Sequence, residues 1–214
     1  MTHELKSPIA GLRAAAEILS DVRATPDEMQ RFLGHITEQT GRLSDIVDHL
    51  LDLAHVETTP HLAGTGPMDM ESVIRREIAT LDPRAGSADV RFDVSIGEAG
   101  SIVGDAFLVG RALANLLENA LAFSPAGASI DVQATRGGES LTVTIRDRGP
   151  GIPDYAVARV FERFYSLPRP DGSRGTGLGL PFVREIARLH GGRLELVNVP
   201  AGGCEAHLVL GLRS

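Results

Sequence analysis

Apolar residues recur at three- and four-residue steps over residues 1–57, which predicts two amphipathic helices. The first stripe consists of Leu5, Ile9, Leu12, Ala16 and Leu19, and the second of Met29, Phe32, Ile36, Leu43, Ile46, Leu50 and Leu53. Between them, Thr25-Pro26-Asp27-Glu28 forms a capping box, with an N-cap, a proline at the first helical position and a glutamate at N3. Because two such helices bury little apolar surface alone, we expect this antiparallel hairpin to dimerise into a four-helix bundle.

The pattern changes after residues 58–67, a polar stretch with two prolines and two glycines that is typical of a linker. Residues 68–214 mix helix and strand patterns. Helices are predicted over about 71–81 and 105–123 and in a last segment ending near residue 190, and strands over 90–96, 129–136, 140–147, 193–198 and 204–211. The sequence therefore predicts an α+β protein in two parts, a helical hairpin (1–57) and a mixed α/β domain (68–214).

Composition narrows the class of protein. With 214 residues, 43% of them hydrophobic, the chain is long enough to fold as one or two globular domains. A net charge of −7 argues against a nucleic-acid partner, because phosphate neutralisation needs clustered Lys and Arg. The one cysteine, Cys204, excludes an internal disulfide and fits a reducing compartment. Since no apolar run reaches the roughly 18–20 residues that cross a bilayer, we expect a cytoplasmic chain without membrane contact.

His3 has the surroundings expected of a nucleophile. Glu4 follows it directly and can accept a hydrogen bond from one ring nitrogen, which leaves the other nitrogen nucleophilic. Ser7 lies one helical turn further on the same face. A lone His-Glu pair is more often structural than catalytic, and only the nucleotide-site motifs below reverse that balance. Because Met1 precedes His3 by two residues, we expect a fragment of a longer protein whose upstream part holds a sensor.

Three further segments carry the chemistry of a nucleotide site. Asn115 and Asn119 share one helix face, and their amide oxygens suit Mg²⁺. Asp147 ends a strand, and its carboxylate can accept from the exocyclic amine of adenine but would be repelled by the carbonyl of guanine. Gly149 and Gly151 then let the backbone approach a flat ring. Taken alone, the two asparagines fit the polar edge of a helix. A D-x-G-x-G segment taken alone is as often a plain loop as part of a nucleotide site.

A glycine-rich turn precedes the last helix and offers backbone N–H groups to phosphate oxygens. The turn consists of Gly175, Thr176, Gly177, Leu178 and Gly179. It is neither a Walker A loop nor a Rossmann turn, because it lacks Gly-Lys-Ser/Thr and no strand leads directly into it. The segment between Gly151 and this turn, with Phe161, Phe164, Tyr165 and many Pro and Gly, is typical of a lid that closes over a nucleotide. It is called the lid segment below.

With these motifs in this order, the whole chain resembles a two-component sensor histidine kinase. The resemblance implies a dimerisation and phosphoacceptor hairpin followed by a two-layer α/β sandwich that binds ATP. It implies that His3 attacks the γ-phosphate of ATP with help from Glu4, and that a response regulator then receives the phosphoryl group on an aspartate. It further implies that Asn119 coordinates Mg²⁺, Asn115 assists at the phosphates, Asp147 binds adenine and Phe123 lines the base pocket. The parent protein is then expected in the bacterial inner membrane.

Residues 161–174 look most like the carbon-source-responsive sensor kinases of enteric bacteria. The chain departs from the family pattern at Ser7, where Thr or Asn is frequent and which is tied to phosphatase activity. Ala122 stands where many members carry a basic residue, and Ser166 replaces a frequent arginine. Three arginines of the lid segment are candidates for supplying the missing positive charge, and the sequence does not decide among them: Arg163, Arg169 and Arg174.

Two other functions are weighed against a kinase. A gyrase-type or mismatch-repair ATPase uses a carboxylate to activate water where this chain has Asn115, so the hydrolytic base is missing. A non-catalytic dimeric scaffold that binds nucleotide and regulator stays open, because a frayed first helical turn would misplace His3.

Overall fold

A computed structural model of the chain describes residues 2–20, 25–58, 65–97 and 101–212. The chain forms two compact units, Met1–Asp52 and Leu53–Ser214. Most of the predicted linker, residues 59–64, lies outside the described residues.

The first unit consists of most of the predicted helical hairpin, whose second helix continues past Asp52. Helix α1 spans Thr2–Leu19 and helix α2 spans Pro26–Thr58. The capping box is confirmed: Thr25 N–H donates to Glu28 Oε2 at 2.9 Å, and Glu28 N–H donates to Thr25 Oγ1 at 3.3 Å. Two donors at the start of α2 are thereby satisfied, which fixes where this helix begins.

The apolar stripe of α1 differs from the prediction at two positions, Ile9 and Ala16, which are both exposed. Ala15 is buried, whereas the predicted Ala16 is exposed, because neighbouring residues on a helix point about 100° apart. Gly11 faces α2, where a Cβ at this position would contact Gln39 Cγ at 3.6 Å. Six apolar side chains of the hairpin stay exposed, namely Ile9, Ile18, Met29, Leu33, Val47 and Leu51.

The second unit is a mixed α/β domain with the predicted strands. Its helices are α3 (Met70–Ser87), α4 (Ala106–Phe123), the short α5 (Asp154–Val157) and α6 (Gly179–Leu189). Its strands are β1 (Gly66–Asp69), β2 (Arg91–Ile96), β3 (Ser101–Gly104), β4 (Ser129–Gly137), β5 (Ser140–Arg146), β6 (Arg193–Asn198) and β7 (Cys204–Gly211). Five strands form one sheet in the order β2-β4-β5-β7-β6, in which only β2 and β4 run parallel.

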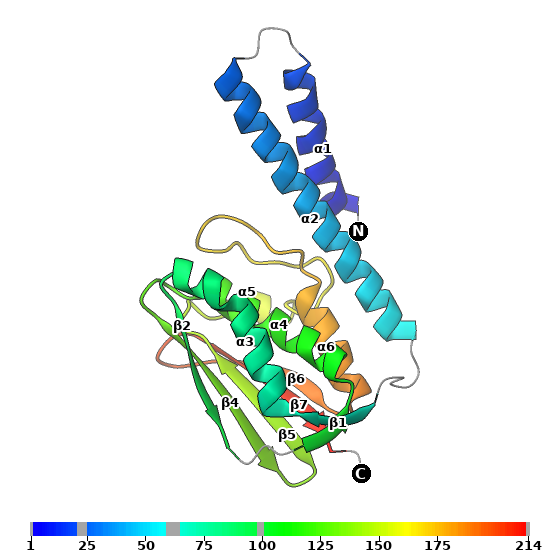
Figure 1. Cartoon of the computed structure of the whole chain (residues 1–214), viewed down its shortest axis with the longest axis vertical. Helices are drawn as coiled ribbons and strands as arrows, with labels where there is room; N and C mark the ends of the chain where they lie inside the picture. Colours follow the sequence, from blue (N-terminus) through cyan, green and yellow to red (C-terminus); the bar gives the residue numbers. More distant parts are fainter. Residues whose placement is uncertain (1, 21–24, 59–64, 98–100, 213–214) are drawn as a thin grey trace. The chain divides into compact units, whose positions relative to one another are not determined.

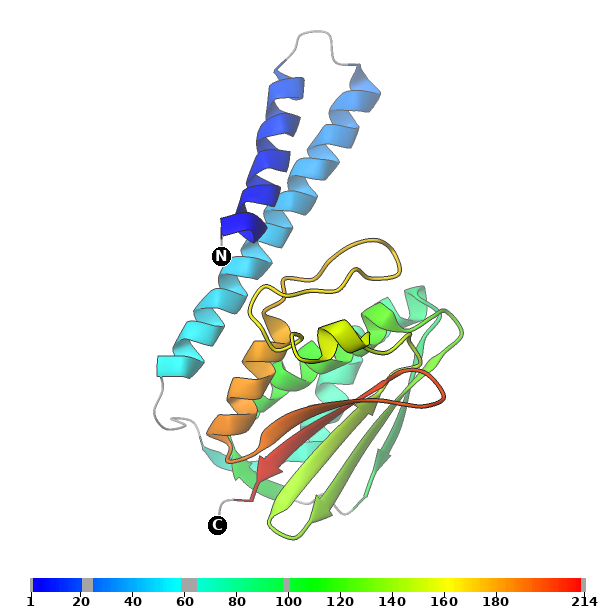
Figure 2. The ribbon, with the colours of Figure 1, turned by 180° about the vertical axis from the view of Figure 1, so that it is seen from behind.

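Helices α3, α4 and α6 cover one face of this sheet (Figures 1 and 2). Alternation along the strands explains the arrangement: in β5, Leu141, Val143 and Ile145 are buried, whereas Thr142 and Thr144 between them are not. The predicted two-layer sandwich is confirmed, with its core between the helices and the sheet.

Three features of this domain were not predicted, the first of which is the short helix α5. Strands β1 and β3 pair as a separate antiparallel ribbon, with Met68 opposite Ile102. Helix α3 continues past the predicted end at residue 81 and through Pro83. Leu81 and Ala85 are both buried one turn apart, so their packing outweighs the hydrogen bond that the proline removes.

His190 joins the two central helices at one end. Its side chain is 2% exposed, Nδ1 bonds the carbonyl of Ile186 at 2.9 Å, and Nε2 accepts from the backbone N–H of Asp105 at 3.1 Å. These partners fix the neutral tautomer with the proton on Nδ1. Asp105 also caps α4, since its Oδ1 accepts from the N–H groups of Phe107 and Leu108. The start of α4 is therefore fixed relative to the end of α6.

Candidate nucleotide-binding site

Asp147 follows β5 directly and is half-buried at the end of the sheet. Its Oδ1 accepts from the N–H of Gly149 at 2.8 Å and from that of Cys204 at 3.2 Å. Burial raises the pKa of Asp147, although these N–H groups and the charge of Arg148 lower it. Within the described residues Oδ2 accepts no hydrogen bond, so it can accept one from a ligand.

Gly149 brings this loop against the end of α4. A Cβ at Gly149 would lie 2.6 Å from the carbonyl oxygen of Phe123, closer than real side chains approach. Only glycine allows the loop to pass here, and the passage places Phe123, which is half-buried, beside the Asp147 loop. Gly151 has a φ of +75°, a backbone conformation that favours glycine.

The asparagines lie on the edge of α4. Asn115 and Asn119 are half-buried, whereas Leu116 and Leu117 are buried. Asn115 donates its Nδ2 to the carbonyl of Arg111 at 2.9 Å, which leaves its Oδ1 to face outward from the helix. A Cβ at Gly179 would lie 2.5 Å from this Oδ1, so the asparagine meets the first residue of α6. The structure thus brings together Asn115 and the glycine-rich turn, which are separated by some sixty residues in the sequence.

A backbone hydrogen bond joins the glycine-rich turn to the segment before it. Phe164 N–H donates to the carbonyl of Gly177 at 2.8 Å, and a Cβ at Gly177 would lie 2.5 Å from Phe164 C. Helix α6 then begins at Gly179, and its N-cap, Leu178, makes no side-chain hydrogen bond to the first turn. In the described part of the chain no side chain caps the N–H groups of Gly179 and Leu180, the arrangement that binds anions; Pro181 has no N–H.

Of the three lid arginines, Arg169 lies at the glycine-rich turn. A Cβ at Gly175 would lie 3.3 Å from Arg169 Nη2. The turn that holds Arg169 is closed by its N–H donating to the carbonyl of Ser173 at 2.8 Å and by a bridge between Pro168 and Arg174. Closure of this segment over a nucleotide remains a prediction.

Four residues beside Asp147 escaped the sequence analysis as site residues. Cys204 N–H bonds the carboxylate, and a Cβ at Gly203 (φ +94°) would lie 2.1 Å from the carbonyl oxygen of Asp147. Burial and the charge of Asp147 raise the pKa of the Cys204 thiol to about 12. The other two, Gly202 and Asn198, flank the same turn between β6 and β7. The only sequence signal was the Gly-Gly pair between two predicted strands.

Three of the predicted catalytic residues belong to the helical hairpin. His3, Glu4 and Ser7 lie in the first two turns of α1, and their side chains lie outside the described residues. Their roles therefore remain predictions.

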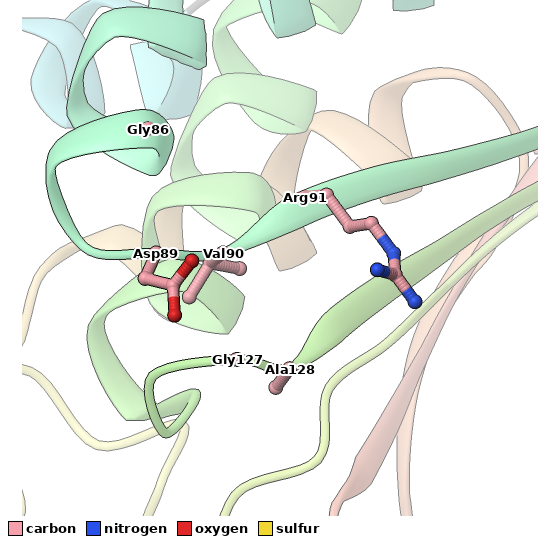
Figure 3. A pocket seen from close by; sticks show the side chains of 6 residues that line it. All are labelled: Gly86, Asp89, Val90, Arg91, Gly127 and Ala128. Carbon is pink, nitrogen blue, oxygen red and sulfur yellow. The ribbon is translucent and has the colours of Figure 1, made fainter.

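A separate shallow hollow lies where α3 leads into β2 (Figure 3). It has a volume of about 200 Å³ and is lined by Gly86, Asp89, Val90, Arg91, Gly127 and Ala128. Asp89 and Arg91 point in different directions in Figure 3, so they do not converge on a ligand. None of the predicted site residues lines this hollow.

Among the described residues, no group of three His, Cys, Asp or Glu side chains converges on a metal position. In that same part of the chain, one helix, Ala106–Phe123, has the length and composition of a membrane span. This helix is α4, which packs against α3 and α6 in the centre of the domain.

Two family models match the chain. Residues 104–214 match the histidine kinase-, DNA gyrase B- and HSP90-like ATPases, a group that includes both kinases and gyrases. Residues 1–59 match the His Kinase A (phospho-acceptor) domain, which decides between them. The chain belongs to the sensor histidine kinases. This family consists of protein-histidine kinases, and its ATPase domain supports ATP as the nucleotide of the site.

Curated relatives agree with this membership of the sensor histidine kinases. The sensor protein CreC of Escherichia coli is 40% identical over 210 residues, which cover 98% of this chain and 44% of CreC. The sensor-like histidine kinase SenX3 of Mycolicibacterium smegmatis is 29% identical over 95% of this chain and 53% of its own length. The chain therefore spans about half the length of the curated relatives it matches.

Solved structures of histidine kinases have the same fold. AdeS of Acinetobacter baumannii aligns over the whole of both chains with a TM-score of 0.83 and 22% identity. The mycobacterial sensor kinase MprB is 33% identical, with a TM-score of 0.61, over 69% of this chain and 97% of the MprB chain. ThkA, solved in complex with the response regulator protein TrrA, has a TM-score of 0.81 and 20% identity over 99% of this chain and 59% of its own.

Proposed function

We propose that this chain is the cytoplasmic kinase core of a sensor histidine kinase, which phosphorylates itself on His3 with Mg-ATP. The phosphoryl group then passes to an aspartate of a response regulator. The observation that carries the proposal is the meeting of the Asn115 oxygen with Gly179, at a helix start whose N–H groups have no side-chain cap. Amide oxygens and free N–H groups side by side suit a metal-bound polyphosphate.

In this proposal the nucleotide lies between the Asp147 loop and the glycine-rich turn. Asp147 Oδ2 accepts from the exocyclic amine of adenine, because Oδ1 is already occupied by two backbone N–H groups. Gly149 and Gly151 allow the close approach of the ring, and Phe123 packs against it. The phosphates bind the backbone N–H groups of the glycine-rich turn, whose residues are Gly175, Thr176, Gly177, Leu178 and Gly179.

Asn119 would hold Mg²⁺, with Asn115 beside it at the phosphates. The fit rests on donor chemistry: neutral, half-buried amide oxygens on one helix edge suit a hard cation that keeps phosphates and waters as its other ligands. When bound, Mg²⁺ neutralises charge on the phosphate oxygens. Arg169 adds positive charge at the same turn, where Ser166 replaces the frequent arginine.

The transfer itself needs a nucleophile and a proton acceptor. The unprotonated ring nitrogen of His3 attacks the γ-phosphorus of ATP, the bond to the bridging oxygen breaks, and ADP leaves. Glu4 accepts the proton from the other ring nitrogen, so that the phosphorylated imidazole is neutral. Ser7 keeps a hydroxyl that orients water for dephosphorylation of the regulator. A relative that is 34% identical to this chain, the histidine-protein kinase/phosphatase MprB of Mycolicibacterium smegmatis, supports this second activity.

The hairpin provides the partner surfaces. The six exposed apolar side chains among the described residues of α1 and α2 support a homodimer through residues 1–57, in which these helices would form a four-helix bundle. The complex of ThkA with TrrA supports a response regulator as the second partner. We further propose a phosphoacceptor hairpin (1–57), a linker (58–67) and an ATP-binding domain (68–214), with the last two linker residues, Gly66 and Pro67, joining the domain as the start of β1. The parent protein is proposed to be anchored in the bacterial inner membrane.

Incubation of the chain with γ-labelled ATP and Mg²⁺ tests the proposal. We expect label in an acid-labile, base-stable N–P bond, lost in His3→Gln and kept in His35→Gln, which changes an exposed histidine of α2. Label that survives His3→Gln would move the phosphoacceptor elsewhere. A dimer that binds Mg-ATP and stays unlabelled would leave only the non-catalytic scaffold.

A further inference from the structure

Asn198, the last residue of β6, holds the backbone of a residue forty-six positions earlier. Its Nδ2 donates to the carbonyl oxygen of Ile152 at 2.7 Å, and its Oδ1 accepts from the N–H of Ile152 at 2.7 Å. Ile152 belongs to no helix or strand, so this side chain supplies the pair of bonds that a neighbouring strand would give. Both bonds are short, and both use the amide in its only complementary orientation.

Ile152 connects the two segments that surround the proposed nucleotide site. It follows Gly151, which ends the adenine-binding loop, and precedes Pro153, the N-cap of α5 at the start of the lid segment. Asn198 therefore holds the chain at the point where the base-binding loop becomes the lid. Gly151 is part of the same contact, because a Cβ there would lie 2.9 Å from Asn198 Oδ1.

The other end of the loop is held by the same hairpin of strands. Asn198 is opposite Cys204 in the register of β6 and β7, and Cys204 N–H donates to Asp147 Oδ1. The connecting turn is closed by Val199 N–H donating to the carbonyl of Gly203 at 3.0 Å. The hairpin of β6 and β7 thus holds the loop at both ends, at Asp147 through Cys204 and at Ile152 through Asn198.

We propose that Asn198 is a positioning residue for nucleotide binding, which sets the distance between the adenine-reading carboxylate and the departure point of the lid. This inference rests on the proposed function, since it assigns a role at the same ATP site. Asn198 does not touch the nucleotide in this proposal. It acts by removing freedom from residues 148–152 before the ligand arrives, so that less conformational entropy is lost on binding.

Three variants test the role. Asn198→Ala removes both hydrogen bonds, and Asn198→Asp keeps the acceptor for Ile152 N–H but loses the donor to its carbonyl. Glu195→Gln is the matched control, because this residue is exposed on the same strand and its carboxylate pairs with Arg193. For each variant we measure the affinity for a fluorescent ATP analogue, amide hydrogen exchange at Ile152 and the thermal midpoint.

We expect Asn198→Ala to weaken ATP binding about tenfold, to accelerate exchange at Ile152, and to shift the thermal midpoint no further than Glu195→Gln does. Asn198→Asp should fall between wild type and Asn198→Ala in affinity while Ile152 N–H stays protected. If Asn198→Ala does not fold, Asn198→Asp carries the comparison with the same three readouts.

Two results would overturn the inference. Unchanged hydrogen exchange at Ile152 in Asn198→Ala would show that the two hydrogen bonds between Asn198 and Ile152, called the clamp below, do not form in solution. Faster exchange with unchanged ATP affinity would show that the clamp does not position the nucleotide. Wild-type protein that binds no ATP would instead refute the proposed function, and the exchange arm would still report on the clamp.

Discussion

Asp147→Asn should separate nucleotide recognition from stability. In the wild type, Oδ1 accepts from Gly149 and Cys204, which leaves Oδ2 for the adenine amine. If the asparagine keeps its oxygen on those two backbone groups, its NH₂ faces the adenine amine, and a donor meets a donor. A hydrogen bond to a charged acceptor contributes about 1.5–3 kcal/mol, so the ATP affinity should fall about 10- to 150-fold.

The same substitution should leave the folded domain at least as stable as the wild type. Burial raises the pKa of Asp147, which means that the charged carboxylate is less favourable in the folded than in the unfolded chain. Below the ordinary pKa of about 3.9 the group is neutral in both states, and its contribution to stability is lost as the pH rises through the raised folded pKa. The thermal midpoint of Asp147→Asn relative to wild type should therefore increase over that window and then level off.

Isothermal titration with ATP and GTP at neutral pH, with thermal unfolding across acidic pH, measures both effects. Asp93→Asn is the control, because Asp93 is exposed on β2, pairs with Arg91 at 3.8 Å and lies outside the proposed site. The role of Asp147 in binding adenine would be refuted if the variant bound ATP within twofold of the wild-type affinity. It would also be refuted if the affinity for GTP did not rise relative to the affinity for ATP. A lower midpoint at every pH would refute the reasoning from burial.

Three further predictions concern the rest of the molecule. Because the pKa of Cys204 is raised from 9.0 to about 12, its thiolate is depleted roughly a thousandfold, and iodoacetamide should modify the native chain far more slowly than the chain in urea; equal rates would contradict this. His190→Ala should lower the free energy of unfolding in urea by about 3 kcal/mol, since it removes a buried ring and its bonds to Asp105 and Ile186, and a loss below about 1 kcal/mol would show that these bonds are not needed. Leu33→Glu should convert the dimer to monomer in light scattering, while Gln30→Glu, which adds the same charge to α2, should not; dimers in both would move the interface away from Leu33.

Much of the fold was predictable because its elements have strong local signals. The Thr25–Glu28 capping box and the alternating pattern of β5 are set by residues a few positions apart, and both were confirmed. The β1–β3 ribbon was missed because its strands have four residues each, too few for a periodic signal, and pair across more than thirty positions.

The candidate site shows the same division. Asp147, Asn115 and the glycine-rich turn were predicted from short motifs, and the structure brings Asn115 to Gly179. Asn198 carried no motif, because its two bonds to Ile152 depend on the register of β6 and β7. Side chains that act through backbone contacts across the sheet leave no trace in local spacing.

The β1–β3 ribbon has a practical consequence for anyone who excises the ATP-binding domain. The family match begins at residue 104, but a fragment cut there would lack β1, β3 and the helix α3 that packs on α4. Met68 Cε fills the space beside Gly104, immediately before the cap of α4, so its removal would expose apolar surface at the base of the helix that bears both asparagines. A soluble, nucleotide-competent fragment should therefore start upstream of Gly66.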